Sequence, residues 1–281
     1  RFVALNGAEV PQLDVVFPVL HGPYGEDGTV QGLLELAGIP YVGPGVMAAA
    51  VGMDKVMMKR VFRQAGLPVV DDVFVTRREI RNQVPAVLNY IEQNLTYPCF
   101  VKPANMGSSV GINRADNRDE LEKALWEAAR FDSKIIVEQG VPAREIECSV
   151  LGNHDAKCSI PGEIIPGGEF YDYEAKYRSE DSKLLIPAPL TDDQVKAVQE
   201  MALKVYEVVD CSGLARIDFF VTKDTGEIYV NEINTLPGFT TISMYPKLWE
   251  ASGIPYEELI TELVDLAFER YKERAENETS L

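Results

Sequence analysis

The stretch Gly213-Leu-Ala-Arg-Ile-Asp-Phe-Phe-Val-Thr-Lys-Asp-Thr-Gly-Glu-Ile-Tyr-Val-Asn-Glu-Ile-Asn234 carries the strongest structural signal in the chain. Two apolar runs flank the turn cluster 223–226, which has a glycine late in the turn and is typical of a β-hairpin. With the turn centred near residues 224 and 225, antiparallel pairing places Asp218 opposite Glu232. The sequence therefore predicts a hairpin with two carboxylates facing each other across it.

One face of this hairpin is predicted to be polar and the other to be core. Side chains two positions apart share a face of a strand, so we expect one polar patch of Arg216, Asp218, Glu232 and Asn234, with Arg216 opposite Asn234. The opposite face would carry Ala215, Ile217, Phe219 and Val221. Opposed carboxylates repel unless a cation lies between them or a pKa shifts. Carboxylate and amide oxygens suit Mg²⁺ beside nucleotide phosphates; the alternative is a solvated hairpin face.

Composition narrows the class of protein. The 281 residues carry a net charge of −17 and are 46% hydrophobic, which is typical of a globular chain with room for two or three domains. The negative charge argues against a nucleic acid or an anionic membrane as partner. No apolar run reaches the roughly 20 residues of a membrane span. An anionic ligand would therefore need locally placed cations.

The cysteines and histidines exclude some kinds of site. Four dispersed cysteines form no Cys-x-x-Cys pair, which argues against a zinc site or disulfide framework and favours a reducing cytoplasm. Two histidines, His21 and His154, are too few for a His-rich metal site. The sequence opens at Arg1 without Met, and we expect a preceding piece to be missing from it.

The order of predicted elements indicates an α/β protein with three parts. Residues 13–20 read as a buried parallel strand that ends at a glycine-rich loop, 21–28, and a helix from Thr29. The middle of the chain reads β-α-β-β-α-β, with a helix at 119–131 and a strand at 134–139. Strands are predicted at 146–151 and 158–165, and helices at 191–209 and 255–274. Residues 166–189 lack a regular pattern and read as a binding loop or lid.

Three loops carry candidate binding residues. Lys102 ends a strand before Gly107-Ser-Ser-Val-Gly111, whose backbone amides could cradle phosphates, although a mobile hairpin tip fits as well. Glu138 and Glu145 flank a Gly-Val-Pro hinge, where they could accept from an adenine amine and ribose hydroxyls or be surface charges. Arg144 could pair with one of them. His21 opens a loop where ligands gather, but a lone histidine is also commonly structural.

Motifs along the whole chain together resemble a known family. Lys102-Pro, Gly107-Ser-Ser-Val-Gly111, Arg216-Ile-Asp218 and Asn231-Glu-Ile-Asn234-Thr-Leu-Pro-Gly238 match the ATP-grasp superfamily. His21-Gly, Gly25-Glu-Asp-Gly28, Met53-Asp-Lys55, Tyr171-Asp-Tyr-Glu-Ala-Lys-Tyr177 and Phe239-Thr-Thr-Ile-Ser-Met-Tyr-Pro246 resemble the bacterial D-alanine–D-alanine ligases more closely. The resemblance implies an α/β (α+β) ATP-grasp fold. Its parts would be a partial N-terminal parallel α/β domain (1–54), a small central domain (55–139) and a C-terminal domain with a mixed or antiparallel sheet (140–281).

The resemblance also implies an activity and its residues: ATP-dependent joining of two D-alanines through an acyl phosphate, in a cytoplasmic homodimer. Two Mg²⁺ or Mn²⁺ ions would be held by Asp218, Glu232 and Asn234. ATP would be bound by Lys55, Lys102, Ser108, Ser109, Glu138, Gln139, Val141, Glu145 and Lys176. Arg216 and the Gly238 amide would stabilise an oxyanion, Ser243 and Met244 would hold the second substrate's carboxylate, and His21 would lie beside the D-alanines. Tyr177 would close the lid toward Ser108.

One departure from the family leaves rivals open. The family's first strand, glycine-rich loop and glutamate, which receives the first D-alanine's ammonium, do not precede Arg1. A D-alanine–D-lactate ligase or another ATP-grasp carboxylate–amine ligase is the nearest alternative. A nucleotide-binding module that has lost catalysis is the alternative from another class, and the intact lysines, arginine and carboxylates argue against it.

Overall fold

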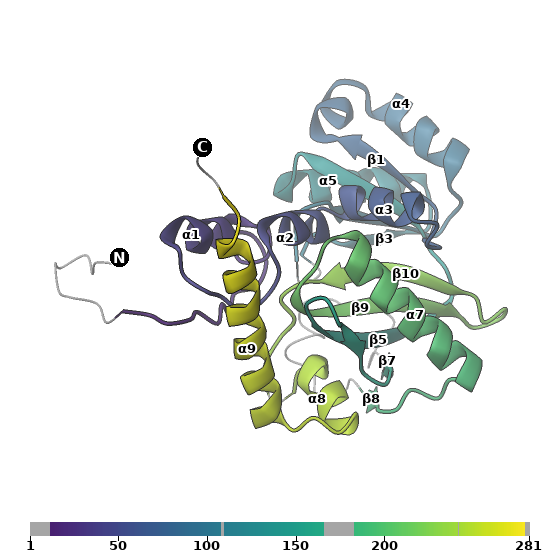
Figure 1. Ribbon diagram of the computed structural model, residues 1–281. Helices are drawn as coiled ribbons and strands as arrows, with labels where there is room; N and C mark the ends of the chain where they lie inside the picture. The colour runs from purple at the N-terminus through teal and green to yellow at the C-terminus, as the bar shows by residue number, and fades with distance from the viewer. Residues whose placement is uncertain (1–11, 108–109, 166–182, 241, 279–281) are drawn as a thin grey trace.

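A computed structural model describes residues 12–107, 110–165, 183–240 and 242–278. Two antiparallel sheets with separate cores lie one above the other in Figure 1, with the N-terminal helices and the C-terminal helix beside them. In the described residues, no helix is both long and apolar enough to cross a membrane. All four cysteines are free, which agrees with the prediction that they form no disulfide framework.

The smaller sheet confirms the predicted β-α-β-β-α-β order. Its elements are β1 (Asp72–Thr76), α4 (Arg77–Asn94), β2 (Cys99–Pro103), β3 (Asn113–Ala115), α5 (Arg118–Phe131) and β4 (Lys134–Gln139). The strand order is β1-β4-β2-β3, and each neighbouring pair is antiparallel. The apolar sides of α4 and α5 cover one face of this sheet, and their residues join those of the strands in one core.

The larger sheet is built around β5. It contains β5 (Ala143–Gly152), β6 (Lys157–Cys158), β7 (Gly162–Ile165), β8 (Lys183–Leu185), β9 (Gly213–Thr222) and β10 (Ile228–Asn234). The order is β10-β9-β5-β7-β8, with β6 also paired to β5. Helix α7 (Asp192–Val208) packs on this sheet and begins, as predicted, at the N-cap Thr191, whose side chain forms a capping box with Gln194.

The hairpin register is as predicted. Asp218 lies opposite Glu232 and Arg216 opposite Asn234, and both pairs follow a bulge in β10 between Val230 and Glu232. The predicted core face is also confirmed, because all four of its side chains are at most 1% exposed: Ala215, Ile217, Phe219 and Val221. Period-two alternation on both strands was sufficient to assign the two faces.

Two strand predictions were wrong. Residues 158–165 form no single strand, because Pro161 lacks a ladder N–H and the Ile160 N–H turns to Ser252 Oγ at 2.9 Å, which separates β6 from β7. Residues 13–20 form no strand either: Val16 makes one parallel bridge with Tyr41, and Val19 is 57% exposed. Part of the stretch expected to lack regular structure, 166–189, is the strand β8.

The N-terminal helices connect the two sheets. They are α1 (Thr29–Ala37), α2 (Val46–Met53), which the sequence analysis missed, and α3 (Lys55–Gln64). Helix α3 lies between the cores: Met58 and Phe62 pack with the larger sheet, whereas Val56 packs with two residues of the smaller sheet region. The domain boundaries at 55 and 140 stay predictions.

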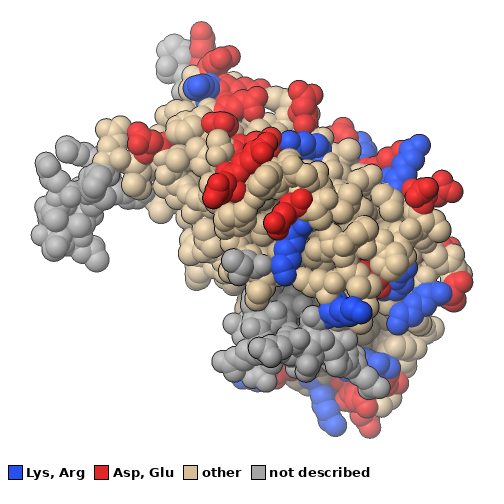
Figure 2. Space-filling model, turned by 90° about the horizontal axis from the view of Figure 1, so that it is seen from below, with Lys and Arg blue, Asp and Glu red and all other residues tan. Residues whose placement is uncertain are grey.

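Two further helices close the base of the larger sheet. They are α8 (Met244–Ala251), also missed, and α9 (Tyr256–Ala275), whose N-cap is Pro255 and which lies within one residue of the predicted helix 255–274. Together with residues from β5 and β9 they form a third core. Figure 2 shows this end of the molecule from below, with acidic side chains gathered in clusters and basic ones in smaller groups between them.

Candidate active site between the two sheets

Three carboxylates form a row across the larger sheet. The register places Glu147 of β5 beside Asp218 of β9, and Asp218 beside Glu232 of β10. The sequence analysis found the two hairpin carboxylates and missed Glu147. Glu145 and Glu147 share a face of β5, which hinted at a second polar face, but the pairing of β5 with β9 joins segments too far apart to read from local pattern.

Arg216 lies within this row. It is 8% exposed, and its guanidinium donates to both oxygens of Asp218 at 2.7 Å, with Glu147 Oε2 at 3.0 Å from Nε. Burial alone lowers the pKa of Arg216, but Asp218 and Glu147 outweigh it and hold the pKa well above its usual value. The arginine is therefore a fixed cation inside an acidic row.

Asn234 adds an unsatisfied oxygen to this wall. Its Oδ1 atom is buried and has no hydrogen-bond partner among the described residues. A buried amide oxygen normally has a partner, and beside Asp218 and Glu232 it has the chemistry of a hard-cation ligand. The described residues contain no group of three or more His, Cys, Asp or Glu side chains close enough to hold a metal by themselves. The donor set thus fits an ion that also takes ligands from phosphates.

Lysines face the carboxylate row from the other side. Lys55 Nζ donates to the Met106 carbonyl at 2.9 Å and lies 3.8 Å from Glu232 Oε2. Lys102 Nζ lies 2.6 Å from Glu138 Oε2. Burial lowers the pKa of Lys102, but the negative charges of Glu138 and Glu232 raise it above its usual value. Both lysines are at most 9% exposed, so this wall is basic and largely dry.

Glu138, which was predicted to accept from an adenine amine or to be a surface charge, is buried behind the cavity. It is 3% exposed and lies between Lys102 and Lys59, whose Nζ is 2.9 Å from Oε1. Burial raises the pKa of Glu138, but the two lysines outweigh it and lower the pKa to about 2. The sequence analysis missed Lys59 because nothing local marks a helical lysine as buried.

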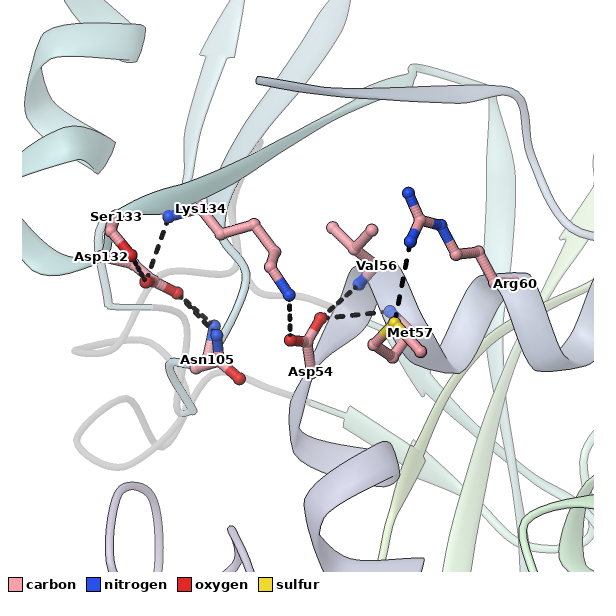
Figure 3. A network of polar contacts seen from close by, with 8 residues as sticks. All are labelled: Asp54, Val56, Met57, Arg60, Asn105, Asp132, Ser133 and Lys134. Carbon is pink, nitrogen blue, oxygen red and sulfur yellow. Dashed lines mark hydrogen bonds and ion pairs between the residues drawn. The ribbon is translucent and has the colours of Figure 1, made fainter. Parts of the chain in front are cut away.

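A polar network holds the loop after Lys102 against the start of α3. Asp54 caps α3 and pairs with Lys134, whose backbone N–H donates to Asp132 (Figure 3). Asp132 also accepts from the backbone and the side chain of Asn105, at 2.8 and 2.9 Å. The pattern Met53-Asp-Lys55 thus matters structurally, because its aspartate fixes the helix whose first residue, Lys55, enters the site.

The loop 21–28 forms another side of the site. The Gly22 N–H donates to the Glu26 carboxylate, and Gly107 lies so close that an added Cβ would be 3.4 Å from Gly22 Cα. Burial, with a contribution from Glu232, raises the pKa of Glu26 to about 7. His21 is exposed at the mouth of the site. Glu26 had been noticed only as a loop residue, and its half-buried position was not predictable from the sequence.

Helix α8 begins at the same cavity. Ser243 is its N-cap, and the Ser243 Oγ accepts from the Thr240 N–H at 3.0 Å. Gly238 lies against it, because an added Cβ would be 2.8 Å from Ser243 Oγ. The first turn of a helix offers unpaired N–H groups to anions. The start of α8 therefore offers N–H groups that could bind an anion at this side of the cavity.

These groups surround a cavity of about 330 Å³. The sequence-predicted residues that line it are His21, Lys55, Arg216, Glu232, Asn234, Gly238, Ser243 and Met244. Lys102 and Asp218 lie directly behind them, in contact with Glu138 and Arg216. A cleft of this size suits a small ligand.

Other predicted residues lie off this cavity or outside the described part of the chain. Gln139 uses its side chain at the end of β4, where Oε1 accepts from the Thr96 N–H at 2.8 Å. Glu145 and Val141 are half-buried along the edge that follows β4. Arg144 pairs with Glu163 through two bonds, because the register brings β7 beside it. Ser108, Ser109, Lys176 and Tyr177 lie outside the described residues.

Family models match both parts of the chain. The model for the N-terminus of D-ala D-ala ligase matches residues 3–44, and the model for its C-terminus matches residues 61–265. The chain belongs to the D-alanine–D-alanine ligase family.

Relatives and solved structures agree. The chain is 57% identical to the D-alanine–D-alanine ligase of Acetivibrio thermocellus over 93% of its own length and 70% of that protein, and 58% identical to that of Heliobacterium modesticaldum over 95% and 73%. A Coxiella burnetii D-alanine–D-alanine ligase structure superposes with a TM-score of 0.82 at 42% identity, covering 93% of this chain and 70% of that one. The VanG D-Ala:D-Ser ligase of Enterococcus faecalis gives 0.84 at 39%, covering 92% and 74%. The fold is the ATP-grasp fold of this family.

Proposed function

We propose that the cavity between the two sheets is where this chain joins two D-alanines at the expense of ATP, for peptidoglycan precursor synthesis. As a member of its family, the chain is an ADP-forming, ATP-dependent ligase. The observation that supports this site is that Glu147 and Glu232, which flank Asp218 in one row, line the same cavity as Lys55, with Lys102 directly behind it. Cations for phosphate and hard ligands for a metal thus meet at one place.

The reaction has two steps. The carboxylate of one D-alanine attacks the γ-phosphorus of ATP, ADP leaves, and an acyl phosphate forms. The neutral amine of the second D-alanine then attacks the acyl carbon, and phosphate leaves from the tetrahedral intermediate. In such phosphoryl transfers positioning and positive charge do most of the work. A lid within 166–189 would exclude water that could hydrolyse the acyl phosphate.

Each side of the cavity has a role in this reaction. Lys55, Lys102 and Lys176 would neutralise phosphate oxygens, together with Ser108 and Ser109 of the sequence Gly107-Ser-Ser-Val-Gly111. Arg216 and the Gly238 N–H would stabilise the oxyanion. Ser243 and the Met244 backbone, at the start of α8, would hold the second carboxylate, and His21 would lie beside the D-alanines. Adenosine would be bound along the edge 138–145 by Gln139, Val141 and Glu145, with Glu138 held by two lysines behind them.

Asp218, Glu232 and Asn234 would hold two Mg²⁺ or Mn²⁺ ions. The unpartnered Asn234 Oδ1 and the two facing carboxylates support this assignment. When bound, the ions would offset the negative charge of the phosphates. Asp218 also accepts two hydrogen bonds from the Arg216 guanidinium. A carboxylate that bound both a metal ion and this guanidinium would align Arg216 with the phosphates.

The nearest alternative function is a ligase that uses a different second substrate, because the D-Ala:D-Ser ligase superposes well. We propose that Tyr177 favours an amine nucleophile by closing the lid toward Ser108. Tyr177→Phe should then raise D-lactate use relative to D-alanine by several-fold, most at low pH where the amine is protonated. One lost hydrogen bond of about 1 kcal/mol gives a change of that size. An unchanged product ratio at every pH would show that Tyr177 does not govern the choice.

The test of the function is D-alanine-dependent ADP release by the chain as given, with mass spectrometry of the product. The expected result is D-alanyl-D-alanine and ADP in equal amounts, and little ADP with L-alanine or without an amino acid. ADP release that ignores D-alanine would instead indicate a nucleotide-binding module without ligase activity. We also propose a cytoplasmic homodimer, which light scattering of the purified chain would check.

A further inference from the structure

A lysine with no assigned role is fully buried behind the site. Lys59 follows Lys55 by one turn of α3, so both extend from the same side of the helix toward the smaller sheet. Lys59 is 0% exposed, and its Nζ lies 2.9 Å from Glu138 Oε1. The other oxygen of Glu138 is 2.6 Å from Lys102 Nζ. One carboxylate therefore bridges two buried lysines.

The charges of this group do not cancel. Lys59, Glu138 and Lys102 carry one net positive charge among them, in a region where each side chain is at most 9% exposed. Bringing a lysine out of water is costly unless it is paired. One lysine and one glutamate would already have formed a neutral pair, so the second lysine needs a reason.

We propose that Lys59 is a positioning residue for ATP: it binds one oxygen of Glu138, so that Lys102 keeps its charge for the phosphates. Without Lys59, both oxygens of Glu138 would turn to Lys102 and form a neutral pair with it. This proposal rests on the proposed function only in taking Lys102 as a phosphate ligand. Lys59 touches no substrate and acts through Glu138 alone.

A purely structural role is the alternative to exclude. Lys59 ties α3 to β4, and losing the tie would destabilise the junction without changing the charge that ATP meets. The two roles differ in which nucleotides they affect. Loss of positive charge at Lys102 weakens the binding of ATP most, of ADP less and of AMP least. A loosened junction would weaken binding by an amount that does not depend on the number of phosphates.

The experiment is calorimetric titration of wild type and Lys59→Met with ATP, ADP and AMP. Methionine keeps the length of the side chain, and Glu138 retains Lys102, so no buried charge is left unpaired. We expect Kd for ATP to rise about 10-fold, an ordinary effect for one charge contact, and Kd for AMP to change less than about 2-fold. Lys59→Arg should restore part of the ATP affinity.

Leu88→Ala is the matched control for stability. Leu88 is 3% exposed in the core of the smaller sheet on α4, away from the cavity, and its truncation lowers stability without touching the charges. It should leave all three Kd values unchanged. The proposal would be overturned if Lys59→Met left all three Kd values unchanged, as is expected for Leu88→Ala. It would also be overturned if Lys59→Met weakened the binding of ATP and AMP equally.

A double-mutant cycle shows whether Glu138 carries the effect. In the Glu138→Gln background, Lys59→Met should change Kd for ATP by less than about 3-fold. An undiminished 10-fold change would mean that Lys59 acts on the phosphates directly, and the proposal would fail. The titrations need no turnover, so they remain decisive if wild type binds ATP but releases no ADP with D-alanine, which would count against the proposed function instead.

Discussion

The two walls of the cavity solve the problem of buried charge in opposite ways. On the side of the smaller sheet, two lysines surround one glutamate, and the wall stays positive. On the larger sheet, three carboxylates in a row surround one arginine, and the wall stays negative. In each wall a single opposite charge holds the group together without neutralising it. A ligand that is anionic and carries a divalent cation, such as ATP with Mg²⁺, matches both walls at once.

Removing one carboxylate should damage the acidic wall most. Glu232→Gln keeps the shape of the side chain but lowers the charge of a proposed metal ligand, so we expect kcat to fall at least about 100-fold with the fold retained. The measurement is ADP release at saturating Mg²⁺, with a thermal melt. Glu227→Gln, an exposed change in the turn of the same hairpin, should have no effect. Turnover near the wild-type rate would remove the hairpin from the metal site.

The next largest fall in activity is expected at Glu147, the carboxylate that the sequence analysis missed. Glu147→Gln leaves Arg216 to Asp218 alone and should draw Asp218 away from the proposed metal position, so kcat should fall about 10- to 100-fold, as for other groups that orient ligands. The Km for ATP should change little, because the lysine wall is intact. Glu163→Gln also removes a buried partner of an arginine, Arg144, but away from the cavity. If both variants lost activity equally, the row would be structural only.

The smallest effect concerns Glu26, which lies near the acidic wall. Its folded pKa of about 7 exceeds the ordinary 4.5, so the folded chain binds more protons than the unfolded one between these values. Stability should therefore fall as the pH rises from about 4.5 to 7. The melting temperature of wild type should drop by a few degrees across this window relative to Glu26→Gln.

The neighbouring residue provides the control for this pH effect. The pKa of Asp27 is lowered: burial raises it, but bonds from Thr29 and Tyr24 outweigh burial. Its contribution to stability is lost only as the pH falls below its ordinary value of 3.8. Asp27→Asn should consequently keep the wild-type slope between pH 4.5 and 7. A wild-type slope in Glu26→Gln would mean that other groups cause it.

The sequence predicted what depends on short-range pattern. The register of Asp218 with Glu232 followed from one turn and two alternating strands, and the smaller domain followed from its periodicities. Family motifs gave further candidate residues that line the cavity, such as Lys55 and Ser243. The strand at 13–20 failed because an apolar run does not specify its partners, and Val16 pairs with Tyr41 alone in the described part of the chain.

The other features of the candidate site depend on long-range contacts and could not be predicted from local sequence. Glu147 becomes part of the site only when β5 lies beside β9, and Lys59 only when α3 packs over β4. Each looks like an ordinary charged residue on a strand or a helix. Helix α8 was missed because it is short and contains Pro246, yet its first turn lines the cavity.

The central claim is that the acidic wall binds divalent ions together with ATP. Electron paramagnetic resonance titration of Mn²⁺, with and without a non-hydrolysable ATP analogue, tests it most directly. The account predicts two Mn²⁺ ions per chain with the analogue, weak binding without it, and loss of at least one ion in Glu232→Gln. Two ions bound equally well in that variant, or full binding without nucleotide, would contradict it.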